Sequence, residues 1–257
     1  MLIDTHAHLY LKEFKEDLNE VLSNAKNVGV QKILLPNIDE TTIEPLNDLC
    51  NQHPNFCLPM MGLHPSSVNG SFKKSLEIIK DQLTKQNYIA IGEIGIDLYW
   101  DDTFLKEQIE AFEIQIDWAK EMKLPIVIHA RDSFEEIFSV LDKKMDKSLF
   151  GVFHCFTGGI AEMEKIFTYK NFYFGIGGIL TFKNAGLDKV VSKIPLDKLV
   201  LETDSPYLSP VPYRGKRNQS SYLYNIAEKL AEVKNVSLDK LIETTGNNAV
   251  ELFKLKD

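Results

Sequence analysis

The chain has 257 residues, of which 44% are hydrophobic and 26% are charged. These proportions are typical of a folded globular protein and exclude a disordered or fibrous chain. The formal net charge of −8 argues against a protein that coats long stretches of nucleic acid, because such proteins usually carry a basic face. It does not exclude an enzyme that contacts only one or two phosphate groups.

The sequence contains no membrane-spanning or targeting segment that we can identify. No apolar run approaches the roughly 18 residues that such a span requires, and the N-terminus reads MLIDTHAHLY, without the basic start and apolar middle of a signal peptide. The three cysteines (Cys50, Cys57 and Cys155) are odd in number and lack CxxC spacing, which favours reduced thiols. We therefore expect a cytoplasmic protein, with no membrane association and no obligate protein partner.

Short apolar runs follow one another along the whole chain, separated by helical patterns. Several are apolar on both faces, as buried parallel strands are. Taken in chain order, the expected strands are Leu2–His6, Lys32–Pro36, Cys57–Leu63, Ile89–Ile96, Pro125–His129, Gly151–Phe156, Phe172–Ile176 and Leu199–Thr203.

The segments between these strands show the spacing of amphipathic helices. The clearest repeats apolar residues from Leu105 to Ala119, with a candidate cap among residues 101–103 and Pro125 beyond its end. The other expected helices are Phe14–Val28, Thr42–Cys50, Lys73–Thr84, Phe134–Leu141, Ile160–Thr168, Asn184–Ser192 and two within Ser221–Phe253, broken near Asn235–Ser237.

Eight strand-then-helix units in about 250 residues have the size and rhythm of a (β/α)8 TIM barrel, an α/β fold. The alternative is a doubly wound open sheet, but neither GxGxxG nor GxxxxGK[ST] follows the first strand. The chain shows no low-complexity linker, internal repeat or break in composition. We therefore expect a single barrel domain over residues 1–257.

The histidines fall at particular places in this pattern. Of the six in the chain, five stand at or just past the C-terminal end of an expected strand, and only His53 lies in a polar loop. The C-terminal ends of barrel strands converge on one mouth, where catalytic groups come from several strands. The five strand-end histidines are His6, His8, His64, His129 and His154.

Two carboxylates occupy equivalent positions, Glu93 after the fourth strand and Asp204 after the eighth. Buried acids repel one another unless a cation lies between them, and nitrogen and oxygen ligands suit zinc, manganese, magnesium or similar ions. A single strand-end histidine is more often structural, but so many groups at one mouth are hard to explain by packing. The predicted metal ligands are His6, His8, Glu93, His129, His154 and Asp204; His64 could be a ligand, a substrate contact or a rim residue.

Seven motifs in register resemble those of the TatD-related deoxyribonuclease family, within the metal-dependent amidohydrolase-like barrels. They are IDTHAHL, GLHP, IGEIGID, LPIVIHARD, HCFTGG, GIGGILTFKN and ETDSPYL, and together they cover essentially the whole chain. The resemblance implies two divalent metal ions (Mg, Mn, Zn or similar). His6, His8 and Asp204 would bind one ion, His129 and His154 the other, and Glu93 would bridge them.

The resemblance also implies a deoxyribonuclease, that is, a phosphodiesterase acting on DNA. Several members of the family work as exonucleases from the 3′ end, so we expect a 3′–5′ exonuclease. The expected mechanism is attack on phosphorus by a hydroxide activated between the two ions, with Asp204 and Glu93 as the catalytic carboxylates and Asp204 as proton acceptor. His64, Arg131 and Arg214 are candidates to hold a phosphate. Arg131 could instead pair with Asp132 or Glu202, and Arg214 could be a solvated loop charge.

Two alternative functions remain open at this point. The same metal centre could serve an amidohydrolase or lactonase acting on a small molecule, or the barrel could be a non-enzymatic binding module, although the complete ligand set speaks against the last. In the loop YRGKRNQSSYL, Gln219 and Ser220 replace the acid and proline usual in the family, which leaves substrate preference open. Asp4 could orient a ligand histidine, and Tyr99 and Trp100 could stack a base, although covering the rim is their simpler role.

Overall fold

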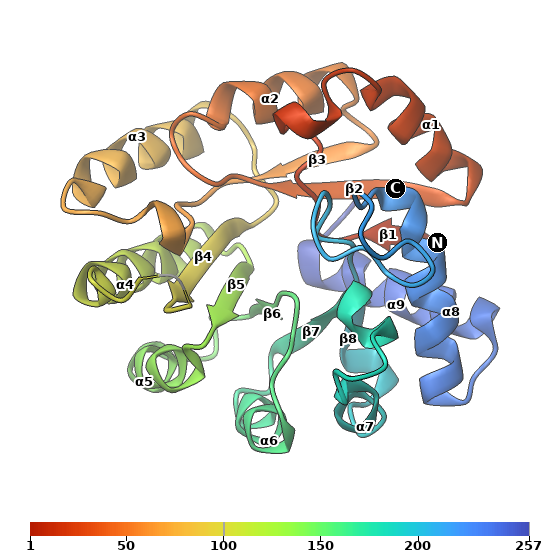
Figure 1. The fold of residues 1–257 in the computed structure, drawn as a ribbon. Helices are drawn as coiled ribbons and strands as arrows, with labels where there is room; N and C mark the ends of the chain where they lie inside the picture. The colour runs from red at the N-terminus through yellow and green to blue at the C-terminus, as the bar shows by residue number, and fades with distance from the viewer. Residues whose placement is uncertain (100, 257) are drawn as a thin grey trace.

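The computed structural model describes residues 1–99 and 101–256, so Trp100 lies outside the described residues. Strands and helices alternate along the chain and form a ring of strands surrounded by helices (Figure 1). The strands are β1 (Leu2–Asp4), β2 (Val30–Pro36), β3 (Cys57–Met60), β4 (Ile91–Asp97), β5 (Ile126–Arg131), β6 (Gly151–Phe153), β7 (Phe172–Ile176) and β8 (Leu199–Leu201). The α-helices are α1 (Leu18–Asn27), α2 (Ile43–Gln52), α3 (Phe72–Lys85), α4 (Leu105–Met122), α5 (Phe134–Lys144), α6 (Ile160–Thr168), α7 (Leu187–Val191), α8 (Leu223–Lys234) and α9 (Leu238–Phe253).

All the strand pairings are parallel, in the orders β1-β2-β3 and β4-β5-β6-β7-β8. Single parallel bridges join the two sheets at both edges, Ala7 to Ser205 and Met61 to Ile91. The Thr5 N–H also donates to the Leu201 carbonyl at 3.0 Å, between β1 and β8. The predicted (β/α)8 TIM barrel is therefore confirmed.

Several strands are shorter than predicted, and the missing residues are those expected to carry the chemistry. β6 ends at Phe153, before His154, and β8 ends at Leu201, before Asp204. Cys155 and Asp204 adopt φ values of 44° and 57°, in the left-handed region that ends an extended strand. The chain therefore turns into the mouth of the barrel where the functional side chains stand.

The helices follow the predicted pattern, although α1 starts four residues after the predicted Phe14, which belongs to a separate 3-10 helix (Lys12–Phe14). The predicted break near Asn235–Ser237 is confirmed: Asn235 has φ 52° and ends α8, and the Ser237 side chain accepts the Lys240 N–H at the start of α9. The capping predicted for α4 is wrong, because the helix starts at Leu105 without a side-chain cap while Asp101 accepts the Thr103 N–H at 2.8 Å. None of the helices among the described residues has the length and apolarity needed to cross a bilayer.

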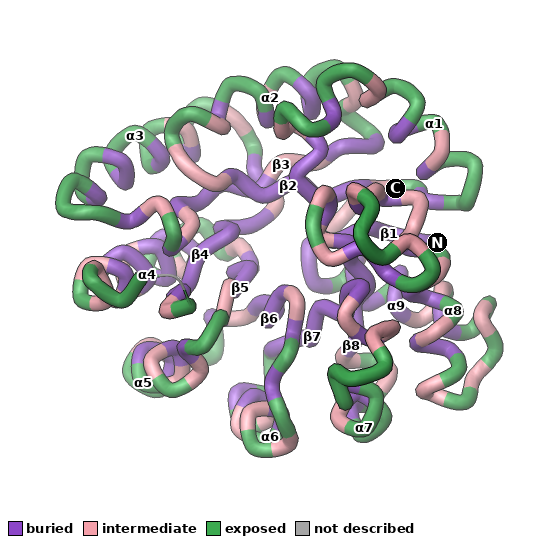
Figure 2. Tube along the Cα trace, viewed as in Figure 1, coloured by how far each residue is buried: buried purple, intermediate pink, exposed green. Residues whose placement is uncertain are grey.

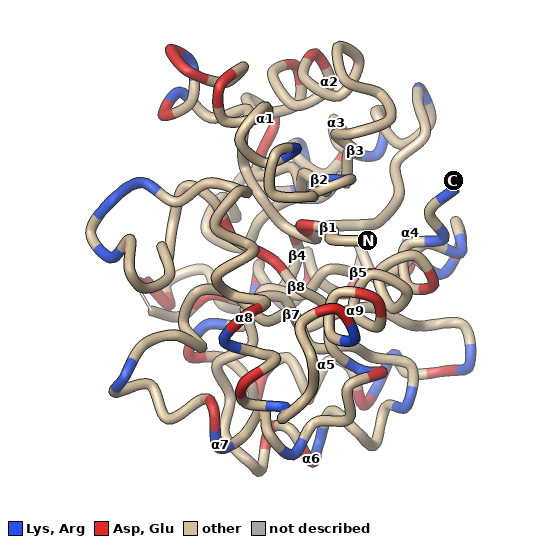
Figure 3. Tube along the Cα trace, turned by 90° about the vertical axis from the view of Figure 1, so that its right-hand side faces the viewer, with Lys and Arg blue, Asp and Glu red and all other residues tan. Residues whose placement is uncertain are grey.

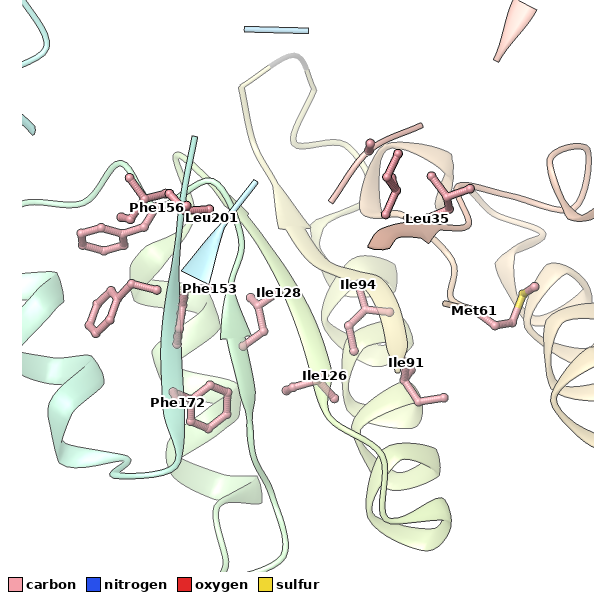
Figure 4. Close-up of a cluster of buried hydrophobic side chains, with 14 of the residues drawn as sticks. Leu35, Met61, Ile91, Ile94, Ile126, Ile128, Phe153, Phe156, Phe172 and Leu201 are labelled. Carbon is pink, nitrogen blue, oxygen red and sulfur yellow. The ribbon is translucent and has the colours of Figure 1, made fainter. Parts of the chain in front are cut away.

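The apolar core has two layers. The outward faces of the strands pack against the surrounding helices, as Figure 4 shows for Ile126, Ile128 and Phe153, and the strands are buried while the helices expose their outer sides (Figure 2). A second cluster takes one residue from each strand or its start and packs against α9. Its buried members are Ile3, Leu34, Met60, Ala90, Val127, Val152, Tyr173, Val200, Ala249, Leu252 and Phe253.

This inner cluster places the site. Because side chains two residues apart on a strand share a face, the residues after this apolar layer point into the barrel at its C-terminal end. His129 follows Val127 in this way, and His154 follows Val152. The barrel interior is therefore apolar near α9 and polar at the opposite mouth.

Candidate metal centre

A cavity of about 640 Å³ opens at the C-terminal ends of the strands. Most of the residues predicted to carry the chemistry line it, together with apolar side chains from the surrounding loops. The lining residues are His8, Ile38, His64, Ser66, Glu93, Asp97, His129, Ala130, Arg131, His154, Cys155, Thr157, Ile179, Asp204, Tyr207 and Leu208.

One oxygen of the Glu93 carboxylate faces the histidines that follow β1. Oε2 lies 3.0 Å from His6 Nε2 and 3.7 Å from His8 Nε2, and these two ring nitrogens are 3.3 Å apart. Oδ1 of Asp204 lies 3.8 Å from His6 Nε2 and 3.6 Å from His8 Nε2. The structure thus brings together the residues predicted to bind the first ion.

The other oxygen of Glu93 faces the histidines from β3, β5 and β6. Oε1 lies 2.7 Å from His129 Nδ1 and 3.2 Å from His154 Nε2. His64 joins this group, with Nε2 3.4 Å from the same oxygen. The residues predicted to bind the second ion therefore also converge, and His64 stands among them.

Four of these histidines have their remaining ring nitrogen next to a polar side chain, through a hydrogen-bond contact in three of them and through a close charge contact at His154. Such contacts fix the orientation of a ligand ring and raise its basicity. The contacts are His8 Nδ1 to Tyr10 Oη at 3.0 Å, His64 Nδ1 to Ser66 Oγ at 2.7 Å, His129 Nε2 to Asp97 Oδ2 at 2.9 Å, and His154 Nδ1 to Glu202 Oε1 at 3.0 Å.

Sequence reasoning missed these four roles. Asp97 carried a signal, since it stands in IGEIGID at the end of the same strand as Glu93. Glu202 carried another, because it lies two residues before Asp204 and so shares its face. Tyr10 lies in a turn and Ser66 in a short 3-10 helix (Pro65–Ser67), where spacing along the sequence does not predict which way a side chain points.

The electrostatics of the site follow from burial and from these short contacts. Burial alone would raise the pKa of Glu93, but His154, His64 and His6 hold it well below its ordinary value. Burial alone would lower the pKa of His154, yet Glu202 and Glu93 raise it well above its usual range. The negative charges of Glu202 and Glu93 thus favour the protonated form of the His154 imidazole.

Asp204 and His6 show the same balance on the other side of the centre. Burial would raise the pKa of Asp204, but the hydrogen bond from His8 and the charges of His154 and His6 lower it. Burial lowers the pKa of His6, and His154 adds to that effect. Asp204 is therefore a carboxylate near neutral pH, able to bind a cation or accept a proton.

Asp4 contacts the backbone of a predicted ligand histidine and not its ring, since its Oδ1 accepts the His6 N–H at 3.4 Å. Its carboxylate accepts from the Thr203 N–H at 2.9 Å and the Thr203 hydroxyl at 2.7 Å, and His6 Nδ1 has no hydrogen-bond partner. Burial raises the pKa of Asp4 to about 7, against the hydrogen bonds that lower it. Asp4 instead ties β1 to the segment after β8.

The two arginines proposed to hold a phosphate lie in different places. Arg131 lines the cavity, and its guanidinium lies 3.7 Å from the centre of the Tyr99 ring. Arg214 is not among the described residues that line the cavity: its guanidinium lies 3.6 Å from the Phe182 ring centre and donates to the Ser209 carbonyl. The geometry therefore favours Arg131 over Arg214 as a contact for bound phosphate.

The donor set fits divalent cations. Groups of ligand atoms within 4.8 Å of one another include His6, His8 and Glu93 on one side, and His64, Glu93 and His129 on the other. Imidazole nitrogens and carboxylate oxygens are the ligands of zinc, manganese and related ions. Glu93 belongs to both groups, and its two oxygens face separate sets of imidazole nitrogens.

A model of the family described as "TatD related DNase" matches residues 3–254. The chain belongs to this family. An uncharacterized metal-dependent hydrolase of Bacillus subtilis, YabD, is 39% identical over 256 residues, with 99% of this chain and 100% of the relative covered. The Escherichia coli K12 protein YcfH, also called an uncharacterized metal-dependent hydrolase, is 31% identical over 258 residues. This match covers 99% of this chain and 96% of YcfH.

Solved structures of TatD relatives share the fold over the whole length. The crystal structure of YJJV, a TatD homologue from Escherichia coli K12, superposes with a TM-score of 0.93 at 27% identity, covering 99% of this chain and 98% of the other. A TatD family hydrolase from Entamoeba histolytica has the same fold, with a TM-score of 0.82 at 21% identity. The superposition covers 98% of this chain and 97% of the other. This chain is thus a metal-dependent hydrolase of the TatD family.

Proposed function

We propose that this TatD-family hydrolase is a phosphodiesterase that acts on DNA and removes nucleotides from the 3′ end. The observation that carries the proposal is the position of Glu93, whose two oxygens face separate groups of imidazoles (2.7 Å to His129 Nδ1 and 3.0 Å to His6 Nε2). A shared carboxylate suits a pair of ions, and paired ions are common in enzymes that cut phosphodiester bonds. The family description adds support for a nuclease.

His6, His8 and Asp204 would hold one ion, His129 and His154 the other, and Glu93 both. When bound, the two ions would stabilise negative charge on the reacting phosphate and lower the pKa of water. Asp204 faces the cavity as a carboxylate and would accept the proton of the attacking water. Arg131 at the cavity wall would hold a nonbridging or neighbouring phosphate oxygen, since a guanidinium matches phosphate geometry in pairs of hydrogen bonds.

The charge distribution supports attack at a strand end more than tracking along a duplex. Blue and red segments are interspersed over α6, α7 and α8 in Figure 3. The affinity of a protein for duplex DNA depends strongly on the number of phosphates that it neutralises. A chain of net charge −8 would bind DNA mainly through the centre itself.

The second candidate is an amidohydrolase or lactonase. It is favoured by the apolar part of the cavity wall, where Ile38, Ile179 and Leu208 contribute side chains. Arg131 is the one arginine or lysine among the described residues that line the cavity. An amide or lactone would need no phosphate contact, so loss of Arg131 should hardly affect its hydrolysis.

The test is digestion of a 5′-labelled single-stranded DNA oligonucleotide with Mg²⁺ or Mn²⁺, with EDTA as control. Support would be a descending ladder that EDTA abolishes and that His129→Ala, folded as judged by circular dichroism, fails to produce. No cleavage by folded, metal-loaded protein would refute the proposal. The same preparations would then be assayed with amide and lactone substrates, to test whether the protein is an amidohydrolase or lactonase.

A further inference from the structure

Tyr207 is an aromatic side chain held half-exposed in the wall of the cavity. It is 51% exposed, lines the cavity and lies beside a predicted ligand, with 6.3 Å between the ring centres of His8 and Tyr207. A large ring exposed to water beside a polar centre contributes little to folding, because its apolar area is not removed from solvent. Its position next to the reacting groups is suited to contact with a bound molecule.

The backbone of Tyr207 is fixed from several directions. Its N–H donates to the Asp204 carbonyl at 2.8 Å, and its carbonyl accepts from Asn218 Nδ2 at 2.6 Å. Asn218 is fully buried and also donates from Nδ2 to the Thr203 carbonyl at 2.7 Å. The ring therefore stands on a hydrogen-bonded turn that also carries Asp204.

The neighbouring loop after β7 supports the same turn. A Cβ on Gly178 would lie 2.0 Å from the Leu208 carbonyl oxygen, so this glycine allows the two loops to approach closely. The Val211 N–H donates to Thr181 Oγ1 at 2.9 Å. As a result, Tyr207, Leu208 and Ile179 form one apolar sector of the cavity wall, which we call the aromatic sector.

The aromatic sector and Arg131 belong to different parts of the mouth. Tyr207 and Leu208 follow β8 and Ile179 follows β7, whereas Arg131 is the last residue of β5. Two strands, β6 and β7, separate β5 from β8 in the sheet order. The wall thus offers the planar ring of Tyr207 near Asp204 and the guanidinium of Arg131 near His129. The proposed metal ligands line the same cavity.

We propose that the Tyr207 ring stacks on the base of a nucleotide adjoining the scissile phosphate, so that the site selects nucleotides over other phosphodiesters. This inference rests on the proposed nuclease function. Every base presents a flat face, so stacking on one aromatic ring is tolerant of sequence. Leu208 and Ile179 would cover the edges of the base, and Arg131 would hold a phosphate further along the strand.

The experiment compares three single-stranded oligonucleotides of equal length: an unmodified one, one lacking the 3′-terminal base, and one lacking the penultimate base. First-cleavage kcat/KM is measured for the wild type, Tyr207→Phe and Tyr207→Leu. Tyr224→Leu is the matched control, because Tyr224 is 36% exposed on α8 and does not line the cavity. Thermal unfolding checks that each variant folds.

The proposal predicts that the wild type and Tyr207→Phe cut one of the abasic substrates on the order of tenfold or more slowly than the unmodified strand. The ratio of kcat/KM for the unmodified strand to kcat/KM for that abasic strand should fall close to one in Tyr207→Leu. It should be unchanged in Tyr224→Leu. A loss of fold or metal would slow all three substrates alike and leave the ratio unchanged. The proposal is overturned if the wild type cuts all three alike, or if the ratio survives in Tyr207→Leu. Failure to cut any strand would instead remove the nuclease function itself, and the stacking role with it.

Discussion

Glu202 Oε1 lies 3.0 Å from His154 Nδ1 and accepts the backbone N–H of Cys155 at 2.5 Å. One buried carboxylate after β8 thus holds both the ring of a predicted metal ligand and the backbone that follows it after β6. Gly175 on β7 makes room for it, since a Cβ there would lie 2.4 Å from Glu202 Oε2. The orientation of His154 therefore depends on three neighbouring strands.

Glu202→Gln is expected to lower metal affinity by roughly 10–100-fold, the usual effect of losing a group that orients a ligand. The amide is similar in shape but lacks the charge that favours the His154 contact. Equilibrium dialysis with Zn²⁺ or Mn²⁺ measures the affinity. Glu232→Gln is the control, because its side chain is 71% exposed on α8. Equal affinities for wild type and Glu202→Gln would mean that Glu202 does not act through His154.

Arg131→Met is expected to raise KM for a phosphodiester about tenfold or more, because charged hydrogen bonds contribute roughly 1.5–3 kcal/mol. Arg131→Lys should recover only part of this loss, since an ammonium lacks the planar fork and the stacking of a guanidinium. Steady-state kinetics with one phosphodiester and one neutral ester compare the effects. An equal loss on both substrates would count against a phosphate contact.

Asn218→Ala is expected to destabilise the protein by about 1–3 kcal/mol, because the buried carbonyls of Thr203 and Tyr207 would lose their donor. Urea unfolding measures the change, with Asn51→Ala on the exposed side of α2 as control. The stacking role of Tyr207 adds a second expectation: the base-dependent cleavage ratio should fall in folded Asn218→Ala. Unchanged stability would show that this amide does not hold the turn.

The positions of the histidines could be predicted because the reasoning needed only strand ends. In a barrel, every parallel strand delivers its last residues to one mouth, so His6, His129 and His154 converge whatever the details of the loops. The same argument placed Glu93 and Asp204. The barrel itself followed from the count and rhythm of strand and helix patterns.

The groups around these residues depend on geometry that spacing does not contain. Whether Asp97 reaches His129 depends on the pairing of β4 with β5, in which Gly95 stands opposite His129 and lets the strands approach closely. Arg214 could not be separated from Arg131 by sequence, because the path of a long loop decides where its side chain lies. The sequence did not predict that the Tyr207 side chain lines the cavity, because this too depends on the path of the loop after β8.

The thiols of Cys50 and Cys57 are expected to resist alkylation in the folded protein at pH 8. Both residues are buried, and burial raises the pKa of Cys57 to about 12 and that of Cys50 above its usual range. A raised thiol pKa leaves little thiolate at pH 8, and thiolate is the reactive form. Iodoacetamide labelling followed by mass spectrometry should find both sites slow in the native protein and fast in urea. Native labelling at the unfolded rate would contradict this burial.

The number of metal ions bound per chain tests most directly whether Glu93 joins two cation sites. The measurement is elemental analysis after equilibrium dialysis of wild type and Glu93→Gln against Mn²⁺ or Zn²⁺, with Glu232→Gln as the exposed control. Two ions per wild-type and control chain, and a loss of at least one in folded Glu93→Gln, are the results predicted from the contacts of Oε1 and Oε2. Fewer than two ions in the wild type, or an undiminished two in Glu93→Gln, would contradict the shared metal centre.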